Sequence, residues 1–169
     1  MKALYGRRGF IKTSAIAGIG LGISGSIVPL FSKGFSPATG KRVGIIGLDT
    51  SHCVAFTKEM NSFDESPELG GYKVVAAYPK GSLDIESSVK RIPGYIEEVK
   101  KMGVEIVDDI PSLLEKVDVI LLETNDGRRH LEQAIPVLKA GKPMFIDKPI
   151  AASLSDAIVI IEAAKHYKT

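Results

Sequence analysis

The chain has 169 residues, 44% of them hydrophobic, and a formal net charge of +2. This length suits one sizeable globular domain plus an extra segment, and the composition excludes an intrinsically disordered protein. Residues 1–40 hold five basic residues and no acidic one, so the remainder carries 17 basic against 20 acidic residues, which does not indicate a basic surface for nucleic acid.

We expect residues 1–31 to act as an export signal. Arg7 and Arg8 match the twin-arginine pattern, and a moderately apolar run over residues 13–31 follows them. A membrane-spanning helix needs about 20 predominantly apolar residues. Because this run is only moderately apolar, we favour export to the periplasm by the twin-arginine machinery over a permanent membrane anchor. The chain would stay anchored in the membrane if the signal were not cleaved. The alternative is an amphiphilic leader with fortuitous arginines. Residues 32–40 then form a linker.

The stretch KRVGIIGLDTSH, residues 41–52, predicts the first strand and turn of a nucleotide-binding α/β unit. The apolar run Arg42–Ile46 is the expected strand, Gly47 begins the tight turn, and a helix follows. In the fingerprint G-x-G-x-x-G the second glycine lets the backbone approach the pyrophosphate, and the third packs the helix on the strand. Asp49 and His52 stand in these two places, so the motif alone is also compatible with an ordinary strand-turn-helix unit.

Strands and helices alternate through the rest of a domain that we place at residues 41–169. Further strands are predicted at 72–78, 104–107, 117–122 and 143–146, and helices at 52–62, 93–102, 110–115, 128–140 and 153–166. Right-handed crossovers between such units make a doubly wound parallel sheet, an α/β fold. In the last helix we expect the side chains of Ile158, Ile161, and Ala164 or Ala163 to face the core.

The end of the second strand bears on the choice between NAD and NADP. A classical NAD site has an acidic residue there to hold the ribose hydroxyls, and this sequence has Tyr78, Pro79 and Lys80 instead. Lys80 could contact a ribose 2′-phosphate and favour NADP, although an exposed loop lysine is usually solvated. Cys53, the only cysteine, excludes an internal disulfide and a multi-cysteine zinc site, and we assign no metal ligands from the sequence.

Polar turns follow two later strands. The run 117–122 continues into Glu123-Thr124-Asn125-Asp126-Gly127, and the strand 143–146 ends at Asp147-Lys148-Pro149. Ligands of doubly wound sheets bind at the carboxyl ends of the strands. The residues predicted around a dinucleotide at this edge are Gly47, Leu48, Asp49, Lys80, Thr124, Asn125, Asp147 and Pro149.

Several stretches in their order and spacing resemble the N-terminal domain of the Gfo/Idh/MocA (glucose-fructose oxidoreductase and inositol dehydrogenase) family. They are Val43-Gly44-Ile45-Ile46-Gly47-Leu48, the strand 118–122, His130, Lys139-Ala140-Gly141-Lys142-Pro143 and Asp147-Lys148-Pro149-Ile150-Ala151. The resemblance implies that NAD or NADP binds and that Lys148 lies beside the nicotinamide and substrate. A cation there lowers the pKa of a reacting hydroxyl and stabilises a developing alkoxide. It also implies a carbohydrate substrate and a homo-oligomer for the complete protein.

The sequence departs from the family pattern in ways that leave alternatives open. Asp49 puts a carboxylate where the pyrophosphate approaches. The turn from Thr124 to His130 is one or two residues longer than the family's Pro-Asn-x-x-His, so Asn125 and His130 are candidates to line the crevice, while His130 could instead pack on its helix. The family's second, substrate-binding domain is not in this sequence, so we expect the chain alone to be inactive. An NAD-dependent glycosidase with transient redox chemistry and a non-catalytic nucleotide-binding or scaffold domain are the alternative functions.

Overall fold

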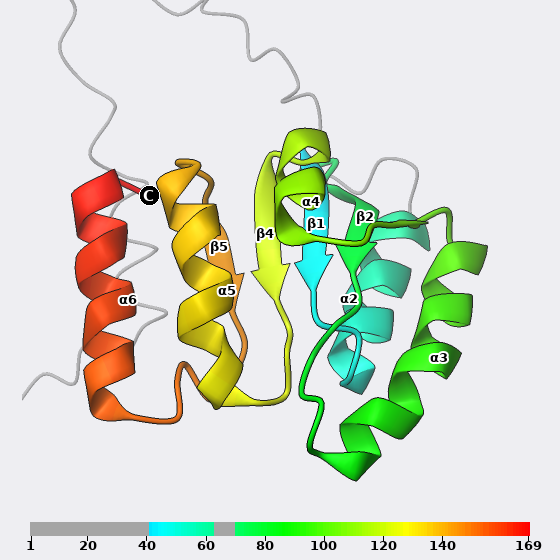
Figure 1. The fold of residues 1–169 in the computed structure, drawn as a ribbon. Coiled ribbons are helices and arrows are strands. Elements are labelled where there is room, and N and C mark those ends of the chain that lie inside the picture. The colour runs from blue at the N-terminus through cyan, green and yellow to red at the C-terminus, as the bar shows by residue number, and fades with distance from the viewer. Residues whose placement is uncertain (1–40, 63–69) are drawn as a thin grey trace, which may run out of the picture. The chain divides into compact units, whose positions relative to one another are not determined.

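A parallel five-stranded sheet with the order β3-β2-β1-β4-β5 lies at the centre of the computed structural model, which describes residues 41–62 and 70–169 (Figure 1). This confirms the predicted doubly wound α/β fold. The expected signal and linker lie outside the described residues. The strands are β1 (Arg42–Ile46), β2 (Lys73–Tyr78), β3 (Glu105–Ile106), β4 (Val119–Leu122) and β5 (Met144–Ile146).

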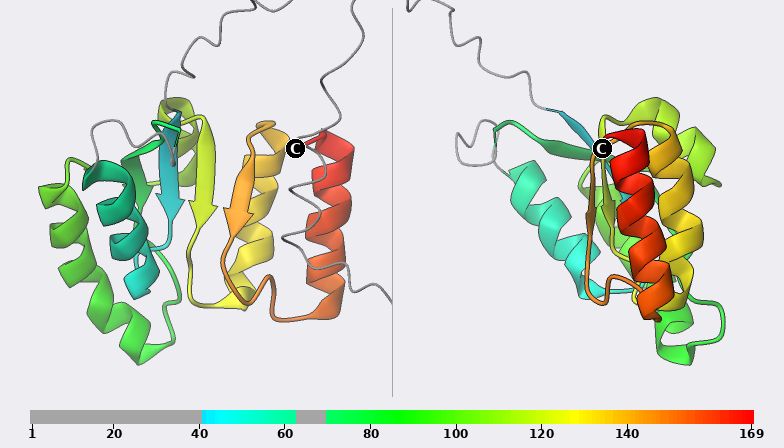
Figure 2. Two further views of the ribbon diagram at one scale, coloured as in Figure 1. Left: turned by 180° about the vertical axis from the view of Figure 1, so that it is seen from behind. Right: turned by 90° about the vertical axis from the view of Figure 1, so that its left-hand side faces the viewer.

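Helices cover both faces of the sheet, as the two further views show (Figure 2). One layer holds α2 (Ser51–Ser62) and α3 (Glu86–Lys101), and the other holds α4 (Ile110–Lys116), α5 (Gly127–Lys139) and α6 (Leu154–Tyr167). Within the described residues, no helix is long and apolar enough to cross a membrane.

The strand β1 is apolar at consecutive positions because it is buried on both faces. Val43 and Ile45 pack in the cluster under α2 and α3, whereas Ile46 packs in the cluster under α4 and α5. All three side chains are at most 1% exposed. On its two edges β1 pairs with β2 and β4, which makes it the central strand.

Two local predictions were wrong. The helix α3 begins at Glu86, and Pro93, which we expected to start it, lies inside the helix on its exposed side. A proline cannot donate the helical hydrogen bond at this position. The loss is tolerated because the carbonyl oxygen left without a partner can bind water. In α6 the core residue is Ile160, at 3% exposed, while Ile158 and Ile161 are 51% and 45% exposed. This helix packs against α5 at the edge of the sheet, so only a narrow stripe is buried.

Candidate functional site

The strand order reverses between β1 and β4. Ligands of doubly wound sheets bind outside the carboxyl ends of the strands at such a reversal. The loops that leave β1, β2, β4 and β5 meet at this edge, which lies below the arrowheads in Figure 1. Most of the polar residues singled out in the sequence lie on these loops.

Gly47 begins the loop after β1 with a φ of +89°. Its N–H donates to the carbonyl oxygen of Tyr78 at 2.8 Å, and the Leu48 N–H donates to that of Pro79 at 3.1 Å. A Cβ at Gly47 would lie 2.4 Å from Thr124 Oγ1 and 2.6 Å from the Thr124 backbone nitrogen. The glycine therefore lets this loop contact the ends of β2 and β4. The side chain of Leu48 is fully buried in the core and does not face the crevice.

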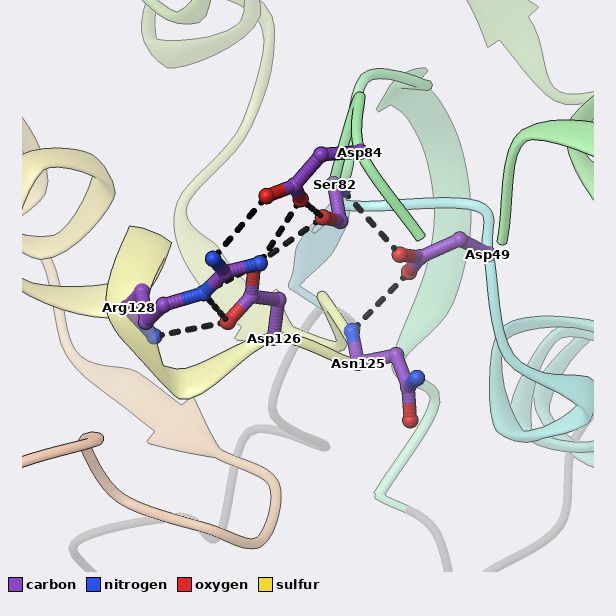
Figure 3. A network of polar contacts seen from close by, with 6 residues as sticks. All are labelled: Asp49, Ser82, Asp84, Asn125, Asp126 and Arg128. Atoms are coloured by element: carbon purple, nitrogen blue, oxygen red, sulfur yellow. Dashed lines mark hydrogen bonds and ion pairs between the residues drawn. The ribbon is translucent and has the colours of Figure 1, made fainter. Parts of the chain in front are cut away.

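Asp49 is also fully buried, and its carboxylate is bound by backbone amides (Figure 3). Oδ1 accepts from the Asn125 N–H at 3.0 Å, and Oδ2 accepts from the Ser82 N–H at 3.3 Å. Figure 3 shows the carboxylate pointing towards the loops after β2 and β4. The negative charge at the second glycine position of the fingerprint is thus engaged inside the protein, and the side chain of Asn125 remains exposed.

Arg128 holds the outer part of the same network (Figure 3). Its Nη1 and Nη2 donate to both oxygens of Asp84 at 2.9 and 2.7 Å, and its Nε and Nη2 donate to Asp126 at 2.7 to 3.0 Å. Ser82 Oγ lies 2.7 Å from Asp84 Oδ1 and 3.0 Å from Asp126 Oδ2. The hydrogen bonds from Arg128, with help from Ser82, lower the pKa of Asp84 to about 2. They also lower the pKa of Asp126.

We expect Arg128→Met to remove a pH-dependent part of the stability. The pKa of Asp84 is depressed from its ordinary 3.8 to about 2, so the stabilisation from this pair is complete above about pH 5 and is lost progressively as the pH falls through about 2. Urea unfolding should therefore show a lower midpoint for the variant at pH 7 and a gap that narrows below about pH 5 and has closed at about pH 1. Arg129→Met is the matched control, because Arg129 pairs with Glu132 on the same helix. A gap for Arg128→Met that does not change with pH would contradict the expectation.

His130 links the loops after β4 and β5. It is fully buried, with Nε2 2.7 Å from the Thr124 carbonyl oxygen and Nδ1 3.2 Å from that of Ile150. Both ring nitrogens therefore face backbone oxygens of the chain. Lys80 lies exposed on the loop after β2, and its carbonyl oxygen accepts from Gln133 Nε2 at 3.2 Å.

The loop after β5 carries Asp147, Lys148 and Pro149. Asp147 Oδ1 accepts from the Lys148 N–H at 2.8 Å. The Lys148 side chain is 77% exposed, and its Nζ lies 3.8 Å from Asp147 Oδ2. The exposed amine is thus available at the strand ends, beside a carboxylate that is only 9% exposed. Pro149 follows and is exposed.

Two residues at this edge that can take part in chemistry were not predicted from the sequence. Glu123 was read only as part of a polar turn, and His52 only as a departure from the glycine fingerprint. Glu123 is fully buried. Burial, and then the charge of Asp147, raises its pKa to about 7. His52 Nδ1 lies 2.5 Å from Asp147 Oδ2 and 4.0 Å from Glu123 Oε2. The signal available in the sequence was an acidic residue directly after a buried strand.

Residues 41–169 match the model of the Gfo/Idh/MocA family, described as an oxidoreductase family with an NAD-binding Rossmann fold. The chain belongs to this family. The match confirms the family resemblance of the sequence, and the strand order is that of the Rossmann fold.

Three of the similar proteins are named as dehydrogenases. Inositol 2-dehydrogenase of Azotobacter vinelandii is 30% identical over 96 residues, which are 56% of this chain and 26% of that protein. Among solved structures, UDP-N-acetylglucosamine 3-dehydrogenase GnnA of Acidithiobacillus ferrooxidans is 16% identical with a TM-score of 0.57, covering 76% of this chain and 36% of that one. A probable dehydrogenase of Thermotoga maritima is 24% identical with a TM-score of 0.56, covering 76% and 34%. The chain thus spans about a quarter to a third of these proteins.

The described residues fit a dinucleotide at this edge. Ser51, at the start of α2, is exposed, and the first turn of that helix has no acidic residue that would repel a phosphate at the helix N-terminus. One N–H of this turn, that of His52, donates to Thr50 Oγ1 at 3.2 Å. The Asp49 carboxylate is already satisfied by two backbone amides. Lys148 offers an exposed amine at the end of β5.

Proposed function

We propose that this chain is the cofactor domain of an NAD(P)-dependent oxidoreductase that acts on a hydroxyl group of a sugar or polyol. The observation that carries the proposal is the exposed Lys148 amine at the carboxyl end of β5, on the edge where the strand order reverses. The presence of an inositol dehydrogenase and a UDP-N-acetylglucosamine dehydrogenase among the similar proteins supports the substrate class.

In this proposal the chain's own residues bind the cofactor and prepare the hydroxyl. The N–H groups at the start of α2 hold the pyrophosphate, and Lys80 holds a ribose phosphate if the cofactor is NADP. The bound cofactor supplies the hydride chemistry. Lys148 orients the reacting hydroxyl and lowers its pKa, because a cation stabilises the developing alkoxide. Asp147, whose carboxylate accepts from the Lys148 N–H, positions the lysine.

Calorimetry of the full chain with NADH and NADPH tests cofactor binding. We expect saturable heat with one of them, and a loss of affinity of about 10-fold or more in Ser51→Glu, because a carboxylate would face the pyrophosphate. Ser155→Glu is the matched control, since it puts the same charge in the first turn of α6. Both substitutions favour their helices, because an acid stabilises a helix N-terminus. The absence of heat at millimolar ligand would favour the scaffold alternative.

Lys148→Ala should lower turnover about 100-fold in a longer form that includes the region this chain does not span, because the reacting centre loses its cation. Cofactor affinity measured by calorimetry should change much less. Turnover is followed by the absorbance of the reduced nicotinamide on sugar and polyol panels. A variant with full turnover would remove Lys148 from the mechanism, and release of free sugar from glycosides without net reduction would indicate the glycosidase.

The periplasm is the destination we propose, on the strength of Arg7 and Arg8 before an apolar run. Changing both arginines to lysine should leave the chain in the cytoplasm, as measured by cell fractionation. Unchanged localisation of that double variant would dismiss the export signal, and full-length chain in the membrane fraction would indicate an uncleaved anchor.

A further inference from the structure

Three side chains with metal-ligating atoms converge on the carboxyl edge of the sheet from three different elements. His52 lies in the first turn of α2, Glu123 follows β4, and Asp147 follows β5. One ligand atom from each lies within 4.8 Å of the others. The imidazole Nδ1 of His52 is 2.5 Å from Asp147 Oδ2 and 4.0 Å from Glu123 Oε2.

Glu123 provides an independent indication that a ligand belongs there. Its side chain is 0% exposed. Among the residues that the structure describes, neither of its carboxylate oxygens has a hydrogen-bond partner. A buried carboxylate without a partner is costly, and native proteins satisfy such groups with hydrogen bonds, counter-ions or metals. Within the described part of the chain, the nearest basic atom to Glu123 is His52 Nδ1, at 4.0 Å, so a cation between the three side chains would satisfy the unpaired oxygens.

We propose that His52, Glu123 and Asp147 bind one divalent transition-metal ion, of which Zn²⁺ and Mn²⁺ are the test cases. One imidazole nitrogen and two carboxylate oxygens suit such ions better than Ca²⁺ or Mg²⁺, which prefer oxygen ligands alone. Three protein ligands leave a coordination position open, which distinguishes sites that bind water or substrate from closed structural sites.

The geometry needs only small side-chain movements to accept the ion. Metal–ligand bonds of about 2.0–2.2 Å in a tetrahedral site place ligand atoms roughly 3.3–3.6 Å apart. The separation of 2.5 Å between His52 and Asp147 would lengthen and the 4.0 Å between His52 and Glu123 would shorten. The His52 side chain is 38% exposed and can turn. Asp147 Oδ1 accepts a hydrogen bond from the Lys148 N–H. Such a hydrogen bond orients a carboxylate whose other oxygen binds a metal.

The site would place a cation close to the residue that the proposed function puts at the reacting hydroxyl. Lys148 Nζ lies 3.8 Å from Asp147 Oδ2, the same oxygen that faces His52. An ion with an open position can polarise a bound oxygen. The binding of the ion itself does not rest on the proposed oxidoreductase function, because its ligands and their geometry are given by this chain alone.

Calorimetric titration of the metal-free full chain with ZnCl₂, and separately with MnCl₂, tests the site. We expect one ion per chain with at least one of the two metals. Glu123→Gln, which keeps the shape and removes the charge, should weaken binding by about 100-fold or more, because changing even an outer partner of a metal ligand costs 10- to 100-fold. The ion should also raise the unfolding temperature of the natural chain and not that of the variant.

Two control variants separate this site from adventitious binding. His166→Gln removes an exposed histidine in the last turn of α6, and Asp118→Asn removes an exposed carboxylate that pairs with Arg42. Neither should change the affinity. Asp147→Asn serves as a second ligand variant if circular dichroism shows that Glu123→Gln is not folded. The absence of saturable binding up to millimolar ion, or equal affinity in the natural chain and a folded ligand variant, would overturn the proposal.

Discussion

Gly47→Ala is expected to lower the free energy of unfolding by about 2–6 kcal/mol, as the sum of backbone strain and overpacking. The residue has a φ of +89°, and its added Cβ would lie 2.6 Å from backbone atoms of Thr124 and 2.4 Å from Thr124 Oγ1. A backbone neighbour cannot rotate out of the way as the end of a side chain can. The loop after β1 would have to separate from the end of β4, and this loop also carries the backbone amides that bond to Tyr78 and Pro79.

Gly103→Ala provides the matched control for that experiment. Gly103 has nearly the same φ, +86°, but a Cβ there would meet nothing within 4 Å. Its alanine variant should therefore lose only the strain of a left-handed residue, about 1–2 kcal/mol. Urea unfolding of both variants, with unchanged slopes, measures the difference. Equal losses at the two positions would show that the contact with Thr124 adds nothing to the strain.

Asp49→Ala is the second substitution for which we expect a large effect. We expect a loss of stability of about 2–6 kcal/mol, because one buried and one partly buried N–H group would each lose a charged acceptor at roughly 1–3 kcal/mol. These groups belong to Ser82 and Asn125, on the loops after β2 and β4. Gly81 shows how closely the loop is packed here, since a Cβ on it would lie 2.2 Å from Asp49 Oδ2. Without the carboxylate, the loops after β1, β2 and β4 would lose the one side chain that accepts from both of the other two loops, although backbone bonds and the Arg128 network would still connect them.

Two further variants make that expectation specific. Asp49→Asn keeps the shape and one acceptor oxygen, so its loss should be intermediate. Asp84→Ala removes an exposed carboxylate of the same network and should have a much smaller effect, because exposed ion pairs contribute little. Chemical unfolding of the three variants gives the order. An Asp49→Ala variant as stable as the natural chain would mean that water satisfies the two amides.

The strands were predictable because each is a local pattern. The runs that became β1, β2 and β4 are continuous and apolar, which is typical of parallel strands covered on both faces. The caps of two later helices also depend on residues close in sequence. The Ser153 side chain accepts from the Asp156 N–H, and the Asp126 side chain accepts from the Arg128 N–H. Helix faces were less predictable. The exposure of Ile158 and Ile161 depends on how far the sheet extends beneath α6, which is a property of the assembled layers.

The sequence by itself determined the alternation of strands and helices, the tight turn at Gly47, the family, and the position of Lys148 after a strand. Each of these depends on residues that are neighbours in the sequence. Only the tertiary structure decided the partners of the polar groups. Asp49 meets amides 33 and 76 residues away, and His52 meets Asp147 across 95 residues. These residues are far apart in sequence but come together in space, because the sheet places β2, β1, β4 and β5 side by side with their carboxyl ends at one edge. A buried carboxylate such as Glu123 therefore has no recognisable role until the loops around it are in place.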